Sequence, residues 1–79
     1  MSSSDQNKPH EMFSRELRQA GHVKRFSIIE APGHGWEIRE EADSEIVRRV
    51  LQHDWHRVER ARKQMERQVV DLEAQGWRS

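Results

Sequence analysis

The spacing of apolar residues between Glu45 and Gln75 is the strongest constraint that this sequence places on its fold. Apolar side chains recur there at helical spacing, mostly three or four positions apart. On a helix they would form one stripe, made of Val47, Leu51, Trp55, Val58, Met65, Val69 and Leu72. The spacing therefore predicts a long amphipathic helix over residues 44–76.

Residues at both ends of this segment favour the helix. Asp43 or Ser44 can cap its first turn, and Gly76 stands where a left-handed residue commonly ends a helix. Trp77 can then pack on Leu72, a contact that often accompanies such an ending. We expect the helix to stop just before the glycine.

Residues 22–43 have the pattern of a β-hairpin. Apolar and β-branched residues lie on both sides of the turn-forming run at 32–35, whose sequence is Pro-Gly-His-Gly. A two-residue loop at 33–34 would set three cross-strand pairs: Ala31 with Trp36, Ile29 with Ile38, and Ser27 with Glu40. The same register would place these side chains on one face: Val23, Ile29, Ala31, Trp36, Ile38 and Ala42.

The N-terminal segment gives a weaker pattern. Residues 1–8 are predicted to be a disordered tail, because they are rich in serine and carry no large apolar side chain after Met1. Residues 9–20 could form a short helix, with Pro9 in its first turn and Gly21 just after its end. Its inward side would carry Met12, Phe13, Leu17 and Ala20.

The predicted fold class is α+β: a two-stranded antiparallel β-hairpin packed on one long C-terminal helix, in a single small domain over residues 9–79. The chain has 79 residues and no cysteine, so no disulfide reinforces its small core. A helix over 45–75 would be roughly 46 Å long, whereas the hairpin strands would reach only about 23–30 Å. Part of the apolar stripe would then need another cover, either the segment 9–20 or a second copy of the chain.

Two charged residues favour the second copy. Asp54 and Arg62 interrupt the stripe symmetrically about Val58. In a homodimer whose helices cross antiparallel at Val58, Asp54 of one copy would face Arg62 of the other and set the register. The alternative is that Asp54 bonds to the hairpin and Arg62 extends to water.

A protein-interaction or regulatory adaptor role, with self-association through the long helix, is the function that we expect. The candidate partner-binding residues are Trp36, Trp55, Val58, Met65, Val69 and Leu72. Tryptophan is enriched among the residues that dominate binding energy at interfaces. The alternative is a core role, because Trp36 and Trp55 can meet where the hairpin packs on the helix.

Binding of nucleic acid or another polyanion is the second functional hypothesis. The helix face opposite the stripe carries a basic ridge: Arg49, His56, Arg60, Lys63 and Arg67. Such a ridge could follow a phosphate backbone. An ordinary solvated helix face is the favoured interpretation, because no aromatic residue interleaves with the ridge and acidic residues flank it.

Metal binding and catalysis have little support. His53 and His56 lie three apart and could share one side of a helix, but two ligands do not complete a zinc site, so two surface histidines are favoured. The chain has no cysteine and no nucleophile motif, and we expect no enzyme activity, cofactor or small-molecule substrate. The N-terminus lacks a basic region and an apolar stretch, so we expect a cytoplasmic protein without a membrane span.

Two runs of residues, 35–41 (Gly-Trp-Glu-Ile-Arg-Glu-Glu) and 54–61 (Asp-Trp-His-Arg-Val-Glu-Arg-Ala), resemble small bacterial proteins of uncharacterised function. The resemblance covers roughly residues 23–77. It implies a hairpin-plus-helix fold in a bacterial cytoplasm. It carries over no functional residues.

Overall fold

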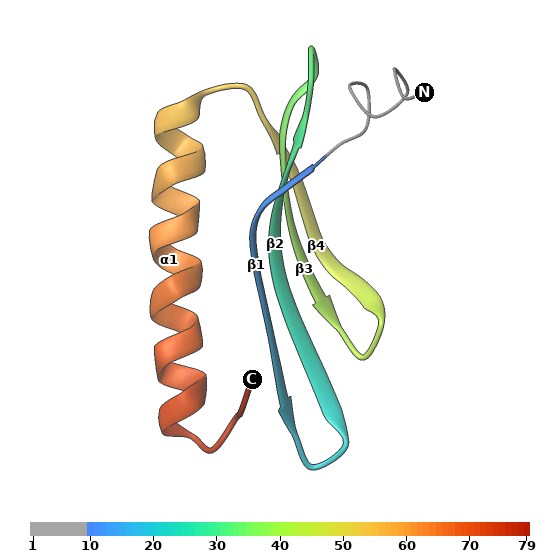
Figure 1. Ribbon diagram of the computed structural model, residues 1–79, viewed down its shortest axis with the longest axis vertical. Helices are drawn as coiled ribbons and strands as arrows, with labels where there is room; N and C mark the ends of the chain where they lie inside the picture. Colours follow the sequence, from blue (N-terminus) through green and yellow to red (C-terminus); the bar gives the residue numbers. More distant parts are fainter. Residues whose placement is uncertain (1–9) are drawn as a thin grey trace, which may run out of the picture.

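The computed structural model describes residues 10–79 as a four-stranded antiparallel sheet followed by one helix. The elements are β1 (His10–Gln19), β2 (His22–Ala31), β3 (Gly35–Ala42), β4 (Glu45–Gln52) and α1 (Trp55–Ala74). Each strand pairs with the next along the chain, so the sheet order is β1-β2-β3-β4. Helix α1 runs along one face of the sheet (Figure 1). The predicted tail at residues 1–8 lies outside the described residues.

The predicted fold class is correct as α+β but wrong in its elements, because the sheet has four strands and not two. The segment 10–19 is strand β1, where a short helix was expected. Its two core residues, Phe13 and Leu17, are four positions apart, and this spacing shares a face in a strand as well as in a helix. The pattern therefore fitted both structures.

The segment 45–52 is strand β4, where the first turns of the long helix were expected. Ile46, Val47 and Val50 are β-branched, and such side chains pack better on a pleated strand than on a helix. The register shifts between Glu40 and Glu41 of β3, which pair with Arg48 and Ile46, so Val47 is an extra residue in β4. This bulge breaks the simple alternation along β4, and the segment therefore lacks the regular pattern that predicts a strand from sequence. The long helix of 44–76 is thus shortened to α1.

A tight turn connects each outer strand to its inner neighbour, β1 to β2 and β3 to β4. Ala20 and Gly21 between β1 and β2 have φ of 52° and 80°, and Asp43 and Ser44 between β3 and β4 have φ of 53° and 71°. Two consecutive residues with positive φ are the mark of a type I′ turn, whose twist matches that of the strands it joins. Asp43 and Ser44 were predicted to cap the helix and form this turn instead.

The pairing of β2 with β3 is shifted by one residue from the predicted register. Ala31 pairs with Gly35 and Ile28 pairs with Ile38, whereas Ile29 was expected opposite Ile38. The loop is one residue longer than predicted, and the His34 N–H donates to the Ala31 carbonyl at 2.8 Å. A shift of one residue moves side chains to the other face of a strand. Ile28 therefore lies in the core.

The core lies between α1 and one face of the sheet. It is made of Phe13, Leu17, Phe26, Ile28, Ile38, Val58, Met65 and Val69. Each strand except β4 contributes to this buried set, and Val50 of β4 is only partly buried against it. Burial of this apolar surface is the main term that holds the helix on the sheet.

Helix α1 ends as predicted. The Gly76 N–H donates to the Glu73 carbonyl at 3.0 Å and the Trp77 N–H donates to the Leu72 carbonyl at 3.0 Å. Gly76 has a φ of 105°. These two bonds form a Schellman ending, and Trp77 and Leu72 both pack against the core.

The residues after the helix return to the sheet. Arg18 of β1 and Arg78 exchange two backbone hydrogen bonds, of 2.7 and 3.0 Å. The C-terminus accordingly lies beside β1 in Figure 1. This contact closes part of the outer edge of β1.

Among residues 10–79, no helix has the length and the apolar character needed to cross a membrane.

Replacing two adjacent isoleucines tests the register. Ile28 is 1% exposed, so Ile28→Ala should destabilise the fold by about 2–5 kcal/mol. Ile29 is half-buried on the opposite face, so Ile29→Ala should cost about 1 kcal/mol or less. Urea unfolding of both variants measures the difference. A larger loss for Ile29→Ala would support the register expected from sequence and contradict the observed one.

Candidate interaction site at strand β4

A single helix is too narrow to cover this sheet. Four strands spaced about 4.8 Å apart make a surface roughly 15–19 Å wide, whereas a helix with its side chains is about 10–12 Å across. Grooves therefore remain along both sides of α1. The groove between α1 and β4 is the larger, with a volume of about 580 Å³.

Positive charge dominates the lining of this groove, which we call the β4 groove. Its apolar floor is made of Ile38, Val50, Ala61 and Met65. Four arginines line it, Arg48 from β4 and Arg57, Arg60 and Arg67 from α1, with two carboxylates, Glu40 and Asp71. The amides of Gln52, Gln64 and Gln68 complete it.

Only part of this charge is neutralised within the chain. Arg48 lies 3.4 Å from Glu40, and Arg57 lies 4.0 Å from the helix-capping Asp54. Within the part of the chain that the structure describes, Arg60 and Arg67 form no ion pair. The β4 groove therefore has a surplus of guanidinium groups, which suit carboxylates and phosphates.

Strand β4 is the open edge of the sheet. Its only strand neighbour among residues 10–79 is β3. Three of its apolar side chains are at least half exposed: Ile46 at 50%, Val47 at 63% and Leu51 at 56%. Unpaired backbone groups beside exposed apolar side chains make a strand prone to pair with another chain. The opposite edge, β1, is partly closed by Arg78.

The sheet face away from α1 is covered by ion pairs. The Glu37 carboxylate contacts both Arg39, at 3.1 Å, and Arg49, and Arg25 pairs with Glu11. Leu51 lies opposite Glu37 in the register, so its side chain is on this face. Charges of both signs alternate here, which leaves the face without a dominant sign.

Most of the predicted partner-binding stripe is buried inside the chain. Val58, Met65 and Val69 belong to the core, and Leu72 packs against it. The sheet thus covers the part of the stripe that was expected to remain free. Apolar surface is exposed on β4 instead.

Trp36 and Trp55 meet, as the sequence predicted. Their ring centroids are 5.3 Å apart and the rings are tilted by 50°. Trp36 is half-buried, and Trp55 is 41% exposed. This contact joins the start of β3 to the start of α1, which accounts for both aromatic side chains within the fold.

Asp54 is the N-cap of α1. Its side chain accepts a hydrogen bond from the His56 N–H at 2.9 Å. Arg62 lies on the side of α1 away from the β4 groove, where it lines a cleft of about 200 Å³ with Met12 and Trp55. Val58, where two helices were expected to cross, is 2% exposed because the sheet covers it. The dimer register pair remains a prediction, although capping already explains the aspartate.

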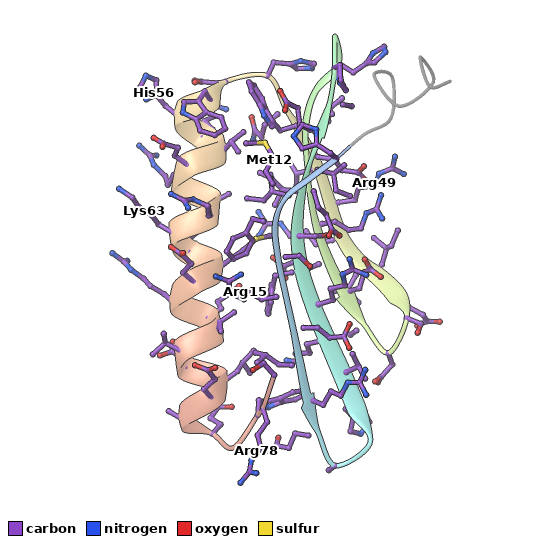
Figure 2. All side chains as sticks on the ribbon, viewed as in Figure 1. Met12, Arg15, Arg49, His56, Lys63 and Arg78 are labelled. Carbon is purple, nitrogen blue, oxygen red and sulfur yellow. The ribbon has the colours of Figure 1, made fainter. Side chains whose placement is uncertain are left out.

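The predicted basic ridge is divided among three surfaces. Arg60 and Arg67 line the β4 groove. His56 and Lys63 point away from the sheet on the outer side of α1 (Figure 2). Arg49 lies beyond the sheet, on the face away from α1 (Figure 2), where it pairs with Glu37. The ridge is therefore not one surface.

His53 and His56 do not gather further ligands. Among residues 10–79, no group of three His, Cys, Asp or Glu side chains is placed to hold a metal ion. His53 precedes α1, close to Gly35, while His56 points outward from the helix (Figure 2).

The turn before β4 is fixed by Asp43. The carboxylate lies 2.9 Å from the His22 ring nitrogen and accepts a 2.9 Å hydrogen bond from the Val23 N–H. The hydrogen bond to His22, followed by the bond from the Val23 backbone, lowers the pKa of Asp43 below its ordinary value. These contacts tie the start of β4 to the start of β2.

Arg48, Arg57 and the open edge of β4 were not predicted from the sequence. The signal was present in the β-branched run at 46–50, which favours a strand. When that run forms strand β4, Arg57, Arg60 and Arg67 lie on the side of α1 that faces β4.

Comparison of the chain with protein-family models, with curated proteins and with solved structures gave no match.

Replacing the helix cap tests the role of Asp54. Asp54→Ala removes the acceptor of the His56 N–H and should destabilise the fold by about 1 kcal/mol. Asp54→Asn keeps a capping oxygen and should retain most of the stability. Chemical denaturation gives both values. Equal losses in the two variants would mean that the charge of Asp54, and not its capping bond, stabilises the chain.

The Asp43 contacts predict a dependence of stability on pH. Because the pKa of Asp43 is lower in the folded chain, its carboxylate stabilises the fold fully above the unfolded value of about 3.9. This contribution is lost as the pH falls through the folded-state pKa. The substitution Asp43→Asn introduces a side chain that tolerates positive φ and lacks this dependence. The difference in melting temperature between wild type and Asp43→Asn should narrow from about pH 5 to about pH 2, and a constant difference would argue against the prediction.

Proposed function

We propose that this chain is a protein-interaction module that binds an extended segment of a partner protein along β4. The observation that carries the proposal is the open edge of β4, with Ile46, Val47 and Leu51 at least half exposed beside it. An edge strand offers backbone donors and acceptors in a fixed row, and an extended peptide can satisfy them. The role is binding, not catalysis.

The proposal keeps the expected adaptor role but moves its surface. The helix residues that were expected to bind a partner lie in or against the core, whereas within residues 10–79 no strand pairs with the outer edge of β4, and its apolar side chains are exposed. Side chains on alternate faces of an added strand would also reach the β4 groove and Leu51. Affinity would come from the backbone pairing and specificity from these side-chain positions.

Self-association through paired β4 strands is disfavoured by charge. Arg48 and Arg49 lie in the middle of β4. Two antiparallel copies would bring two such pairs of arginines together, and like charges opposite each other destabilise a strand pair. A different protein, with an uncharged or acidic strand, fits the edge better.

Polyanion binding is the second candidate, and the four arginines of the β4 groove favour it. This site replaces the predicted ridge. A polyanion that binds there should lose affinity steeply as the salt concentration rises, whereas apolar and backbone pairing should be much less sensitive to salt.

Selection from a displayed library of random linear peptides tests the proposal. Peptides that bind should slow the hydrogen exchange of backbone amides in Glu45–Gln52. Binding without protection of β4, or failure to select any binder, would contradict a strand-docking function.

Two lysine substitutions provide the matched comparison. Leu51→Lys places a charge beside the docked strand and should weaken binding roughly tenfold. This factor corresponds to part of the free energy gained by burying a leucine side chain. Val70→Lys makes the same change at a 62% exposed site on α1 and should leave the affinity unchanged. Equal effects would show that the peptides do not recognise the β4 edge.

A further inference from the structure

We infer that the partner segment is an extended strand with acidic side chains at alternate positions on the face that turns toward α1. The inference rests on the proposed strand docking at β4 and specifies the chemistry of the partner. It follows from the different surroundings of the two faces of β4.

The two faces of a docked strand would meet different surfaces. Successive side chains of a strand point to opposite faces of the sheet. On the helix side, the next strand beyond β4 would lie beside Arg48 and under the arginines of α1. On the other side it would lie beside Leu51, Arg49 and Ile46, where Arg49 is already paired with Glu37. The helix-side positions therefore favour carboxylates, and the other positions favour apolar side chains.

The spacing of the arginines sets the number of acidic positions. Helix α1 returns alongside the sheet after the short link at 53–54, so Arg57, Arg60 and Arg67 follow one another along the groove. From the first to the last, the helix rises about 15 Å. Side chains on one face of a strand are about 6.8 Å apart, so about three alternate acidic residues fit this row.

A protein strand explains the lining of the groove better than a nucleic acid does. Among the described residues, no aromatic side chain lines the β4 groove, whereas proteins that bind single strands stack the bases on aromatic rings. Glu40 and Asp71 stand at the end of the groove near the β3–β4 turn, where a phosphate backbone would place a charge at every nucleotide, whereas a peptide can place its few carboxylates beside the arginines alone. The glutamine amides can bond to the polar groups of a peptide.

Three probes separate the alternatives: a short peptide of alternating glutamate and valine, the same peptide with lysine in place of each glutamate, and an oligothymidylate. The acidic peptide should bind the full chain at least about tenfold more tightly than the basic one, because about three ion pairs each contribute up to about 1 kcal/mol. It should also protect the β4 amides from exchange. Fluorescence anisotropy and hydrogen exchange provide the two readouts.

Matched substitutions test which positive charges of α1 contact the acidic peptide. Arg60→Gln and Arg67→Gln should each weaken binding of the acidic peptide about two- to fivefold, the effect of one exposed ion pair. Lys63→Gln removes the same charge from the outer side of α1 (Figure 2) and should change the affinity by less than the error. Equal effects of Arg60→Gln and Lys63→Gln would overturn the inference.

The outcomes distinguish the inference from the function on which it rests. If both peptides protect β4 and bind equally, β4 accepts strands and only the acidic preference is wrong. If neither peptide protects β4, strand docking itself fails. Oligothymidylate binding that the acidic peptide displaces and that weakens in Arg60→Gln would assign the groove to nucleic acid instead. A salt-independent dimer in light scattering, with β4 protected, would make a second copy the occupant.

Discussion

The packing of one helix against four strands is the constraint on which the other features of this structure depend. Val58, Met65 and Val69 of α1 cover Phe26, Ile28 and Ile38 at the centre of the sheet, and this contact is the whole of the described core apart from β1. Because the helix is narrower than the sheet, the residues at the sheet margins must tolerate water. The polar lining of the β4 groove meets that requirement, and the arginines that meet it become available to a ligand.

The two edges of the sheet are protected from pairing with other chains in different ways. At β1, the chain returns after α1 and Arg78 supplies backbone partners to Arg18. At β4, no such segment is present among residues 10–79, and charge is the means that limits unwanted pairing. Arg48 and Arg49 make β4 a poor partner for another β4. In the proposed docking, Arg48 also belongs to the groove that would favour an acidic strand, whereas Arg49 lies on the other face and pairs with Glu37. Arg48 would thus contribute both to limiting self-pairing and to the proposed specificity for a partner.

The sequence predicted the α+β class, the end of the helix at Gly76, the hairpin at 22–43 and the contact of Trp36 with Trp55, because each depends on local signals or bulky aromatic residues. It did not predict β1 and β4. Apolar residues four positions apart, such as Phe13 and Leu17, share a face in either element, and only pairing with a neighbouring strand decides between them. The candidate site was mostly missed for the same reason, since the groove exists only when β4 is a strand. Asp54 was noticed as an interruption of the stripe, although its role is local capping.

The order of the strands also has a kinetic consequence. Every strand of the sheet pairs with its immediate neighbour along the chain, through turns of two or three residues. Such short-range pairings close small loops and favour rapid folding. Among the backbone pairings of the strands, the contact between Arg18 and Arg78 is the exception, because it joins positions separated by nearly the whole described chain. We therefore expect the sheet and helix to assemble first and the β1 edge to be sealed last, so that, among residues 10–79, a newly folded molecule briefly has two open edges and a mature one has a single open edge.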